Sequence, residues 1–199
     1  MIINGVPVKD TYAEAFDFVG TRVIVTADTL DWAREAAREA VGMGTSIIGC
    51  GGEAGIEKEV KETPDGRPGV AFLVFAPDKE KLHDQLFGRI GMCVLTCATS
   101  SAFNGLDSED KVETGEMLRC FGDGYEYSES KNGATYWHVP MMDGEFVVEG
   151  TYGVANGIGG GNFIIFGQER KACLEAALRA VEAAKKVEGV LLPFPHGVV

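Results

Sequence analysis

The chain contains 199 residues, 45% of them hydrophobic, which is enough for one full core with a sizeable insertion. Its formal net charge of −12 makes an acidic surface that repels nucleic acid and anionic membranes, so we expect neither as a partner. The sequence has no apolar run long enough to cross a bilayer, no export signal at its start, and five cysteines, an odd number; together these favour free thiols and a cytoplasmic location.

Strand and helix patterns alternate over the first half of the sequence. β-branched and apolar runs predict buried strands, whereas alanine- and leucine-rich stretches with a period of about 3.6 residues predict helices. The expected elements are a strand and turn over 1–7, strands over 22–27, 45–49, 70–76 and 92–97, and helices over 12–16, from 28 or 29 to about 41, and from 77 to about 91. From residue 22 to residue 97 their order is β-α-β-β-α-β. We therefore predict an α+β fold of the ferredoxin-like, split βαβ kind, in which an antiparallel sheet carries its helices on one face.

The second half begins with a region of different character. Corners rich in glycine, aspartate and asparagine separate short β-prone runs over 117–121, 135–139 and 145–149, with a polar tip over 126–133. These features predict a β-rich insertion over about 98–150. The last expected elements are a strand over 163–166, a helix over about 169–187 and a strand over 190–192. We expect them to pack onto the same core, so that 1–199 forms a single lobe with its core in 21–97 and 151–199.

A glycine-rich stretch, Gly157-Ile158-Gly159-Gly160-Gly161-Asn162, precedes the expected strand over 163–166. Glycines in such a place bring the backbone very close to a ligand or to another part of the protein. A dinucleotide fingerprint would have to open a helix and carry a third glycine where Asn162 stands, so we do not expect a nucleotide here. The pattern favours a close contact between parts of the protein, and a ligand site stays the alternative.

Two loops carry candidate site residues. Glu53 follows the expected strand over 45–49 in a glycine-rich turn, where a pocket residue and a solvent-facing residue are both reasonable interpretations. Asp65 and Arg67 lie in Pro64-Asp65-Gly66-Arg67-Pro68, and Pro-Asp-Gly forms tight turns in many proteins. A guanidinium fixed between glycine and proline can also bind a carboxylate or a phosphate.

Metal and nucleophile chemistry have little support in the sequence. Cys93 and Cys97 are too widely spaced along a strand to share a metal, and there is no Cys-x-x-Cys pair beside the three histidines, so we expect no metal site. No Gly-x-Ser-x-Gly elbow accompanies a Ser-His-Asp set. Asp123 and Glu145 fit ordinary turn acids.

Several motifs nevertheless occur together along the chain. The most specific is Glu62-Thr63-Pro64-Asp65-Gly66-Arg67-Pro68-Gly69. The others, each weak alone, are Asn4-Gly5-Val6 with 10–16, Cys50-x-x-Glu53-Ala54-Gly55-Ile56-Glu57, Cys93-Val94-Leu95-Thr96, Phe121-x-Asp123-Gly124, Gly144-Glu145-Phe146, Gly160-Gly161-Asn162-Phe163 and Pro193-Phe194-Pro195. In this order they resemble the formylmethanofuran:tetrahydromethanopterin formyltransferase family over essentially the whole chain. The sequence of 21–29 and 48–56 is closer to that of the bacterial members, which are found in formyltransferase/hydrolase complexes.

The resemblance implies a two-lobed α/β subunit, each lobe ferredoxin-like, that assembles as a homotetramer in the cytoplasm. It implies transfer of a formyl group between the amine of methanofuran and N5 of tetrahydromethanopterin, with these carriers as substrates and no metal or tightly bound cofactor. Family members continue past Pro193-Phe194-Pro195 into a second lobe that holds the glutamate proposed for proton transfer, whereas this chain ends at Val199 and has His196 where glycine is usual. It therefore resembles the first lobe of a formyltransferase, alone or with a companion second-lobe subunit. The alternative is a non-catalytic carrier-binding or assembly subunit of a formyltransferase/hydrolase complex.

Residue chemistry then suggests roles within a carrier-binding cleft. We expect Glu53 or Asp123 to relay a proton, Arg67 beside Asp65 to bind the acidic tails of the carriers, and Asn162 to donate to an oxyanion or to the pterin. The backbone amides of Gly160 and Gly161 would assist Asn162.

Overall fold

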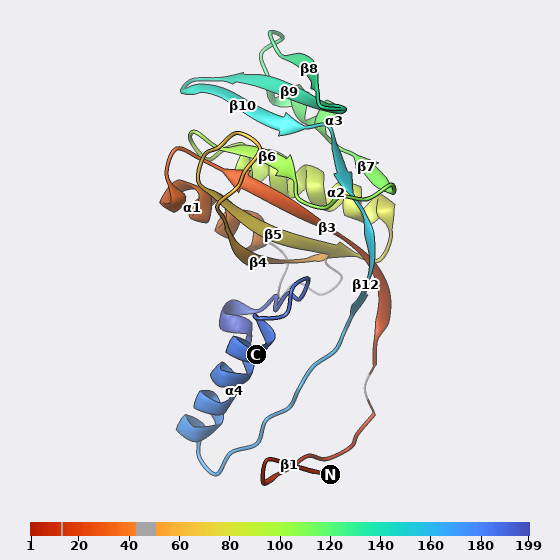
Figure 1. The fold of residues 1–199 in the computed structure, drawn as a ribbon, viewed down its shortest axis with the longest axis vertical. Coiled ribbons are helices and arrows are strands. Elements are labelled where there is room, and N and C mark those ends of the chain that lie inside the picture. Colours follow the sequence, from red (N-terminus) through yellow and green to blue (C-terminus); the bar gives the residue numbers. More distant parts are fainter. Residues whose placement is uncertain (13, 43–50) are drawn as a thin grey trace.

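The computed structural model describes residues 1–12, 14–42 and 51–199. One large sheet carries helices on one face, and the N-terminal strands and the last helix form the opposite end of the molecule (Figure 1). The α+β class predicted from the sequence is confirmed. Within the described ranges, no helix is long and apolar enough to span a membrane.

The first hundred residues build one half of this sheet. Its elements in chain order are β3 (Phe16–Thr26), α1 (Leu30–Gly42), β4 (Glu53–Val60), β5 (Gly69–Ala76), α2 (Lys79–Arg89) and β6 (Ser101–Asn104). In space the strands follow the order β4-β5-β3-β6, and each neighbouring pair is antiparallel. Both α1 and α2 lie on the same side of these strands (Figure 1).

The core lies between these helices and the sheet. Alternate residues of β3 and β5 point into it, and Val23, Val25 and Phe72 are fully buried. Four alanines of α1, at the spacing of one helix face, are also fully buried, and their small size lets the helix lie close to the strands: Ala33, Ala36, Ala37 and Ala40. The other face of the sheet carries apolar side chains such as Leu73 and Phe103 as well as polar ones such as Thr26 and Ser101.

The β-rich region continues the same sheet rather than forming a separate one. Its strands are β8 (Tyr127–Lys131), β9 (Ala134–Met141) and β10 (Gly144–Glu149), in the spatial order β6-β10-β9-β8. The β10–β6 pair is parallel, and the pairs of the β8–β9–β10 hairpins are antiparallel. The remaining elements here are β7 (Lys111–Glu113), which pairs with β11 (Thr151–Gly153), and the short helix α3 (Gly115–Leu118).

Several sequence-based predictions are wrong. The strand expected over 92–97 is a helical turn, Ile90–Val94, because Ile90 and Val94 share one buried helical face that a short apolar run does not distinguish from a strand. The strand expected over 117–121 is α3 and a 3-10 turn, and the tip over 126–133 contains β8. The described residues of 12–16 are not helical, and β4 was missed because its charged residues read as a loop. The strand expected over 45–49 lies outside the described residues.

Segments from the start and from the last part of the chain extend away from the sheet on the side opposite the hairpins (Figure 1). The strand and turn expected over 1–7 are confirmed as the pair β1 (Ile2–Ile3) and β2 (Val6–Pro7). β12 (Ala155–Gly159) pairs with the first half of β3, and Gly157 and Gly159 lie so close to the rings of Phe75 and Phe18 that a Cβ atom would collide with them. The helix α4 (Arg170–Ala184) follows as predicted. The strands expected over 163–166 and 190–192 do not form.

Candidate functional site

The face of the sheet opposite the helices, here called the polar face, gathers polar side chains where β6 meets the hairpins β8–β9–β10. Strand pairing sets Thr26 opposite Ser101, and Tyr136 opposite both Glu129 and Glu149, so these side chains point to the same side. Residues from both halves of the sheet therefore meet on a single surface.

A groove of about 580 Å³ lies on this face, between the loop before β5 and the hairpins β8–β9–β10. It is lined by Pro64, Asp65, Arg67, Ser101, Phe103, Glu129, Lys131, Asn132, Tyr136, His138, Glu145 and Val147. Asp65 and Arg67, two of the predicted substrate-binding residues, are therefore together in this groove. Its size and mixed lining are those of a small-molecule site.

Arg67 ties the loop to the sheet. Its Nε donates to Asp65 Oδ2 at 2.9 Å, and its Nη1 donates to Thr99 O at 2.5 Å and Asp28 Oδ1 at 3.3 Å. Its Nη2 donates to Ser101 Oγ at 2.7 Å and Thr26 Oγ1 at 3.3 Å. A guanidinium has five N–H donors, and these five contacts give each of them an acceptor within the protein. An anionic ligand would have to displace one of these acceptors, and the exposed Asp28 is the easiest to displace.

Asp65 is held as a carboxylate by the same loop. Its Oδ2 accepts from Thr26 Oγ1 at 2.7 Å and its Oδ1 accepts from the Arg67 amide at 3.1 Å. Burial alone would raise the pKa of Asp65, but these hydrogen bonds and the Arg67 guanidinium outweigh it and lower that pKa. The turn is therefore a fixed, ionised edge of the groove.

Thr99 shows that the backbone beside Arg67 is strained. This β-branched residue has a φ of 62°, in the left-handed region that such residues rarely adopt. Its carbonyl accepts from Arg67, and its amide donates to Asp143 Oδ2 at 2.5 Å. The two contacts hold Thr99 in this conformation and connect the loop of Arg67 to the turn of the β9–β10 hairpin. Strain of this kind is concentrated at functional sites.

The opposite wall of the groove centres on His138. Its Nδ1 lies 3.0 Å from Glu145 Oε2, its Nε2 lies 3.6 Å from Glu129 Oε1, and its ring stacks on Tyr127 at 4.5 Å between centroids. The Tyr127 hydroxyl also donates to Glu145, at 3.3 Å. The imidazole is thus oriented through Nδ1, whereas its buried Nε2 has no hydrogen-bond partner among the described residues and is left for a polar ligand.

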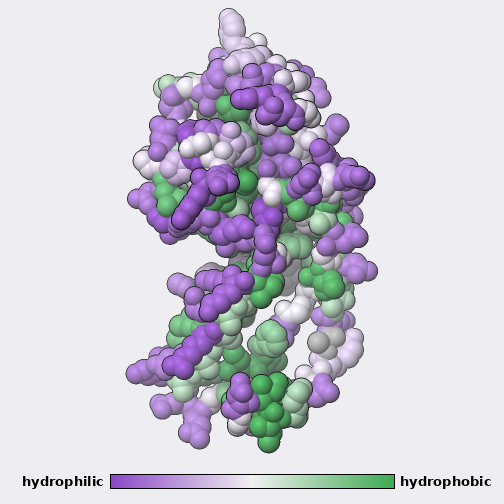
Figure 2. All heavy atoms as spheres, viewed as in Figure 1, coloured by the Kyte–Doolittle hydropathy of each residue, from purple (hydrophilic) through white to green (hydrophobic). Residues whose placement is uncertain are grey.

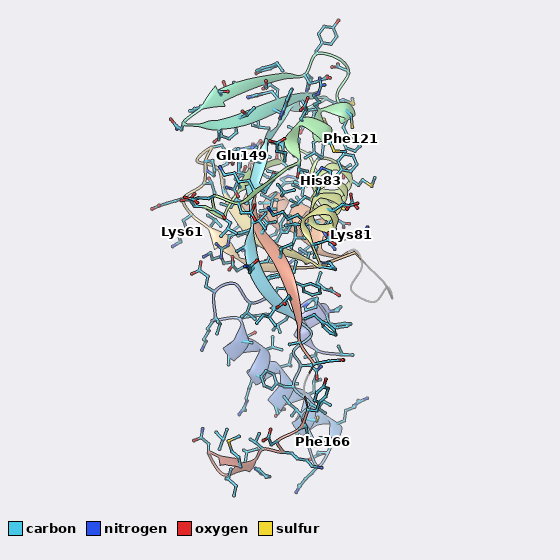
Figure 3. The ribbon with its side chains drawn as sticks, turned by 90° about the vertical axis from the view of Figure 1, so that its right-hand side faces the viewer. Lys61, Lys81, His83, Phe121, Glu149 and Phe166 are labelled. Carbon is cyan, nitrogen blue, oxygen red and sulfur yellow. The ribbon has the colours of Figure 1, made fainter. Side chains whose placement is uncertain are left out.

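Aromatic side chains complete the lining of the groove, and a buried acid lies beside one of them. Phe103 and Tyr136 meet edge to face at 6.2 Å. Where the hairpins join the rest of the sheet, Glu149 is only 9% exposed, and its Oε2 accepts from the Asn104 amide at 2.9 Å (Figure 3). Burial raises the pKa of Glu149, and this hydrogen bond offsets the effect only in part. The pKa of Tyr136 is also raised, first by burial and then by the neighbouring Glu149.

The structure does not bring the other predicted site residues to this groove. Glu53 begins β4 at the far edge of the sheet, opposite Phe75. Asp123 accepts from the Tyr125 amide at 3.1 Å in an exposed turn. Asn162, whose amide reaches Gly160 O at 3.5 Å, and Gly161 are exposed beyond β12, and Gly160 adopts a φ of 93° where it passes Phe16. The predicted residues therefore lie in at least three places.

A second cavity of about 700 Å³ lies on the other side of the hairpins and contains none of the predicted residues. It is lined by Glu113, Thr114, Glu116, Met117, Arg119, Cys120 and Glu126. The groove on the polar face remains the better candidate because it combines ordered charges, aromatic walls and a strained backbone. Within the described ranges, no three His, Cys, Asp or Glu side chains are placed to hold a metal ion.

Sequence reasoning missed His138 and Glu129 and took Glu145 for a turn acid. The available signal was the alternation of polar residues along the hairpin strands, in which Tyr127 and Glu129 point to one face, as do Tyr136 and His138. Spacing alone does not give the strand register that brings them together.

Comparison with known proteins gives matches over the whole of this chain. A model of the formylmethanofuran–tetrahydromethanopterin formyltransferase family matches residues 1–141, and a model of the proximal lobe of that family matches 144–199. The junction between the two models falls inside the region expected to be an insertion. The chain is 51% identical over 205 residues to the formylmethanofuran–tetrahydromethanopterin formyltransferase of Methylobacillus flagellatus, covering 100% of this chain and 68% of that protein.

Other relatives agree. Over 206 residues, the chain is 46% identical to a component of the formyltransferase/hydrolase complex of Methylorubrum extorquens, covering 99% of this chain and 66% of that one. Two solved structures superpose on 100% of the present chain. The crystal structure of that complex with methylofuran gives a TM-score of 0.94 at 45% identity, with 67% of the matched chain covered. The formyltransferase of Methanosarcina barkeri gives 0.89 at 46% identity, with 68% covered.

Proposed function

The chain belongs to the formylmethanofuran–tetrahydromethanopterin formyltransferase family, and we propose that it transfers a formyl group between formylmethanofuran and N5 of tetrahydromethanopterin. The observation that carries this proposal is 51% identity over 100% of the chain to a formyltransferase of that name. Both carriers enter as substrates, and the chemistry of formyl transfer asks for no further group.

The reaction sets clear demands on the site. N5 attacks the formamide carbon, the bond between that carbon and the methanofuran nitrogen breaks, and the proton lost from N5 is taken up by the departing amine. The site must stabilise the intermediate oxyanion and move that proton. Holding both carriers in a fixed orientation supplies much of the rate.

We propose that the groove on the polar face binds part of a carrier. Phe103 and Tyr136 offer aromatic walls, and Glu129, Glu145 and Lys131 offer acceptors and a donor at its rim. Asp65 and Arg67 act there by fixing the loop, with Asp28 as the contact that an acidic tail can replace. Two sets of roles stay predictions: proton relay by Glu53 or Asp123, and donation to substrate by Gly160, Gly161 and Asn162. These residues lie away from the groove, so a second lobe or another chain would have to bring them to a carrier bound there.

The finer description of fold and assembly is also proposed. The antiparallel order β4-β5-β3-β6 supports a ferredoxin-like, split βαβ unit. The division of the chain stays a prediction from the sequence: a single lobe with its core in 21–97 and 151–199 and a β-rich insertion over about 98–150. A homotetramer or a companion subunit is supported by the multi-subunit complex in which a similar chain was solved. A cytoplasmic location stays a prediction.

The second candidate is a non-catalytic carrier-binding or assembly subunit. It is favoured by one observation, the 46% identity to a protein named as a component of a formyltransferase/hydrolase complex.

The deciding experiment mixes the purified chain with formylmethanofuran and tetrahydromethanopterin and follows N5-formyl product. Glu145→Gln removes a groove carboxylate without changing its shape and should lower kcat/KM about 10-fold. Glu109→Gln, an exposed glutamate outside the groove, is the matched control and should leave kcat/KM unchanged. Carrier binding without product would contradict the transferase proposal and support the binding subunit.

A further inference from the structure

Nitrogen Nε2 of His138 is a buried atom of the groove that has no hydrogen-bond partner among the described residues. In Figure 2, hydrophilic residues predominate over the hairpins β8–β9–β10 that carry His138, whereas apolar residues gather at the opposite end of the molecule. Buried ring nitrogens of histidine are normally hydrogen-bonded. An unpartnered nitrogen in the lining of a groove therefore points to a ligand that supplies the missing partner.

The other ring nitrogen fixes the position of the imidazole proton. Nδ1 of His138 lies 3.0 Å from Glu145 Oε2. A carboxylate only accepts hydrogen bonds, so Nδ1 carries the proton of the neutral ring and Nε2 presents a lone pair. Tyr127 holds this arrangement, since its ring stacks on the imidazole at 4.5 Å and its hydroxyl donates to Glu145 at 3.3 Å. His138 Nε2 is thus an acceptor with a fixed direction.

A second acceptor faces His138 Nε2. The nearer carboxylate oxygen of Glu129, Oε1, lies 3.6 Å away, which is too long for a hydrogen bond between a ring N–H and an oxygen. The Glu129 side chain is 53% exposed on the edge strand β8, so it is free to turn toward a proton on Nε2 if there were one. The gap is that of two acceptors that face each other with no proton between them.

Such a pair of acceptors restricts the chemistry of its ligand. One group with two N–H bonds, directed to Nε2 and to the carboxylate, satisfies both acceptors. A hydroxyl or a secondary amide has a single hydrogen and satisfies only one of them, whereas an amino group has enough. The negative charge of Glu129 further favours an amino group that carries positive charge.

We propose that His138 Nε2 and Glu129 Oε1 together bind an amino group of a carrier, with Glu145 as the positioning residue that keeps the proton on Nδ1. The choice of ligands rests on the proposed function. Both carriers have an amino group: the free amine of methanofuran and the amino group on C2 of the pterin ring of tetrahydromethanopterin. The groove, at about 580 Å³, has room for the end of either carrier.

The test uses nitrogen NMR of the 199-residue chain labelled with ¹⁵N-histidine, titrated with methanofuran in one arm and tetrahydromethanopterin in the other. The chain has three histidines, and His83 and His196 serve as internal references because neither lines the groove. We expect Nε2 of His138 to resonate as an unprotonated nitrogen in the free chain. It should shift toward the protonated position in the arm whose carrier supplies the amino group.

Two variants remove the acceptor pair while keeping its shape. The side-chain amide of Glu129→Gln donates to Nε2 and so occupies the place of the ligand, and His138→Phe keeps a ring to stack on Tyr127 but has no nitrogen. Each should weaken binding of that carrier about 10-fold, the change expected from losing one charge-assisted hydrogen bond. Glu109→Gln, an exposed glutamate outside the groove, is the matched control and should leave the dissociation constant unchanged.

Circular dichroism of each variant verifies that it is folded. The inference is overturned if Nε2 is already protonated in the free chain, if neither carrier shifts it, or if both folded variants bind as tightly as the parent. Formyl transfer by a chain whose Nε2 signal does not move would refute this inference alone. A shift of Nε2 without any transfer would refute only the transferase proposal.

Discussion

Replacing Arg67 by alanine separates the two roles that this residue can have. If Arg67 mainly ties the Thr63–Gly69 loop to the sheet, its loss will destabilise the fold and loosen the groove. If it mainly binds the acidic tail of a carrier, its loss will weaken binding and leave stability almost unchanged. Its five protein acceptors favour the first role.

The size of the effect follows from those contacts. Hydrogen bonds contribute about 1 kcal/mol each when neutral and about 1.5–3 kcal/mol when charged. The contact with Asp28 is discounted because that carboxylate is 64% exposed, and water can replace part of the rest since the Arg67 side chain is 30% exposed. For Arg67→Ala we therefore expect the free energy of unfolding to fall by about 2–4 kcal/mol.

Urea unfolding followed by circular dichroism measures this loss, and the Michaelis constants of both carriers are measured on the same samples. Arg38→Ala, which breaks only an exposed pair with Glu35 within α1, is the control and should change stability little. Arg67→Lys keeps the charge but not the five donors, so it should restore little of the lost stability. A loss below about 1 kcal/mol for Arg67→Ala, with carrier binding recovered by Arg67→Lys, would refute the reasoning.

Three further predictions follow from individual contacts. Hydrogen bonds lower the pKa of Asp65 in the fold, so the Asp65 carboxylate stabilises the protein at pH values above the ordinary pKa of aspartate, and this contribution disappears as the pH falls through the lowered pKa. Asp65→Asn should therefore reduce the free energy of unfolding at pH 7 and change it almost not at all at pH 2, as measured by urea titration. The raised pKa of Glu149 has the opposite effect on stability, because the stability present at low pH is lost as the pH rises through the raised pKa. The stability of Glu149→Gln relative to the parent protein should therefore increase from pH 4 to pH 7, and an equal difference at the two pH values would contradict the burial argument. At Gly153 a Cβ atom would collide with the carbonyl of Leu106, so Gly153→Ala should cost at least about 2 kcal/mol in thermal unfolding, whereas Gly161→Ala, with nothing within 4 Å, should cost far less.

The parts of the fold that the sequence predicts well are those where one pattern dominates. The continuous apolar run of β5 and the alanine stripe of α1 leave no reasonable alternative to a buried strand and a covering helix. The run Ile90–Val94 is equally apolar but short, and its conformation is decided by the continuation of α2. Edge strand β4 carries so many charges that its sequence resembles a loop.

The candidate site was harder to predict because it depends on pairing between distant strands. The Pro64–Pro68 turn identified Asp65 and Arg67, but the five acceptors of Arg67 come from β3, β6 and the loops between elements. His138 meets Glu129 and Glu145 only through the registers of β8, β9 and β10. The strands expected beside α4 fail for a different reason, because no strand of the described structure lies beside them to pair with.

The central claim is that the groove on the polar face holds a carrier, and its most direct test is a hydrogen-exchange footprint of the chain with and without methanofuran. Binding in the groove should slow exchange in β6 and in the Ala134–Met141 and Gly144–Glu149 strands, and Glu145→Gln should remove that protection. Protection confined to the second cavity around Glu113–Cys120, or unchanged by Glu145→Gln, would contradict the claim.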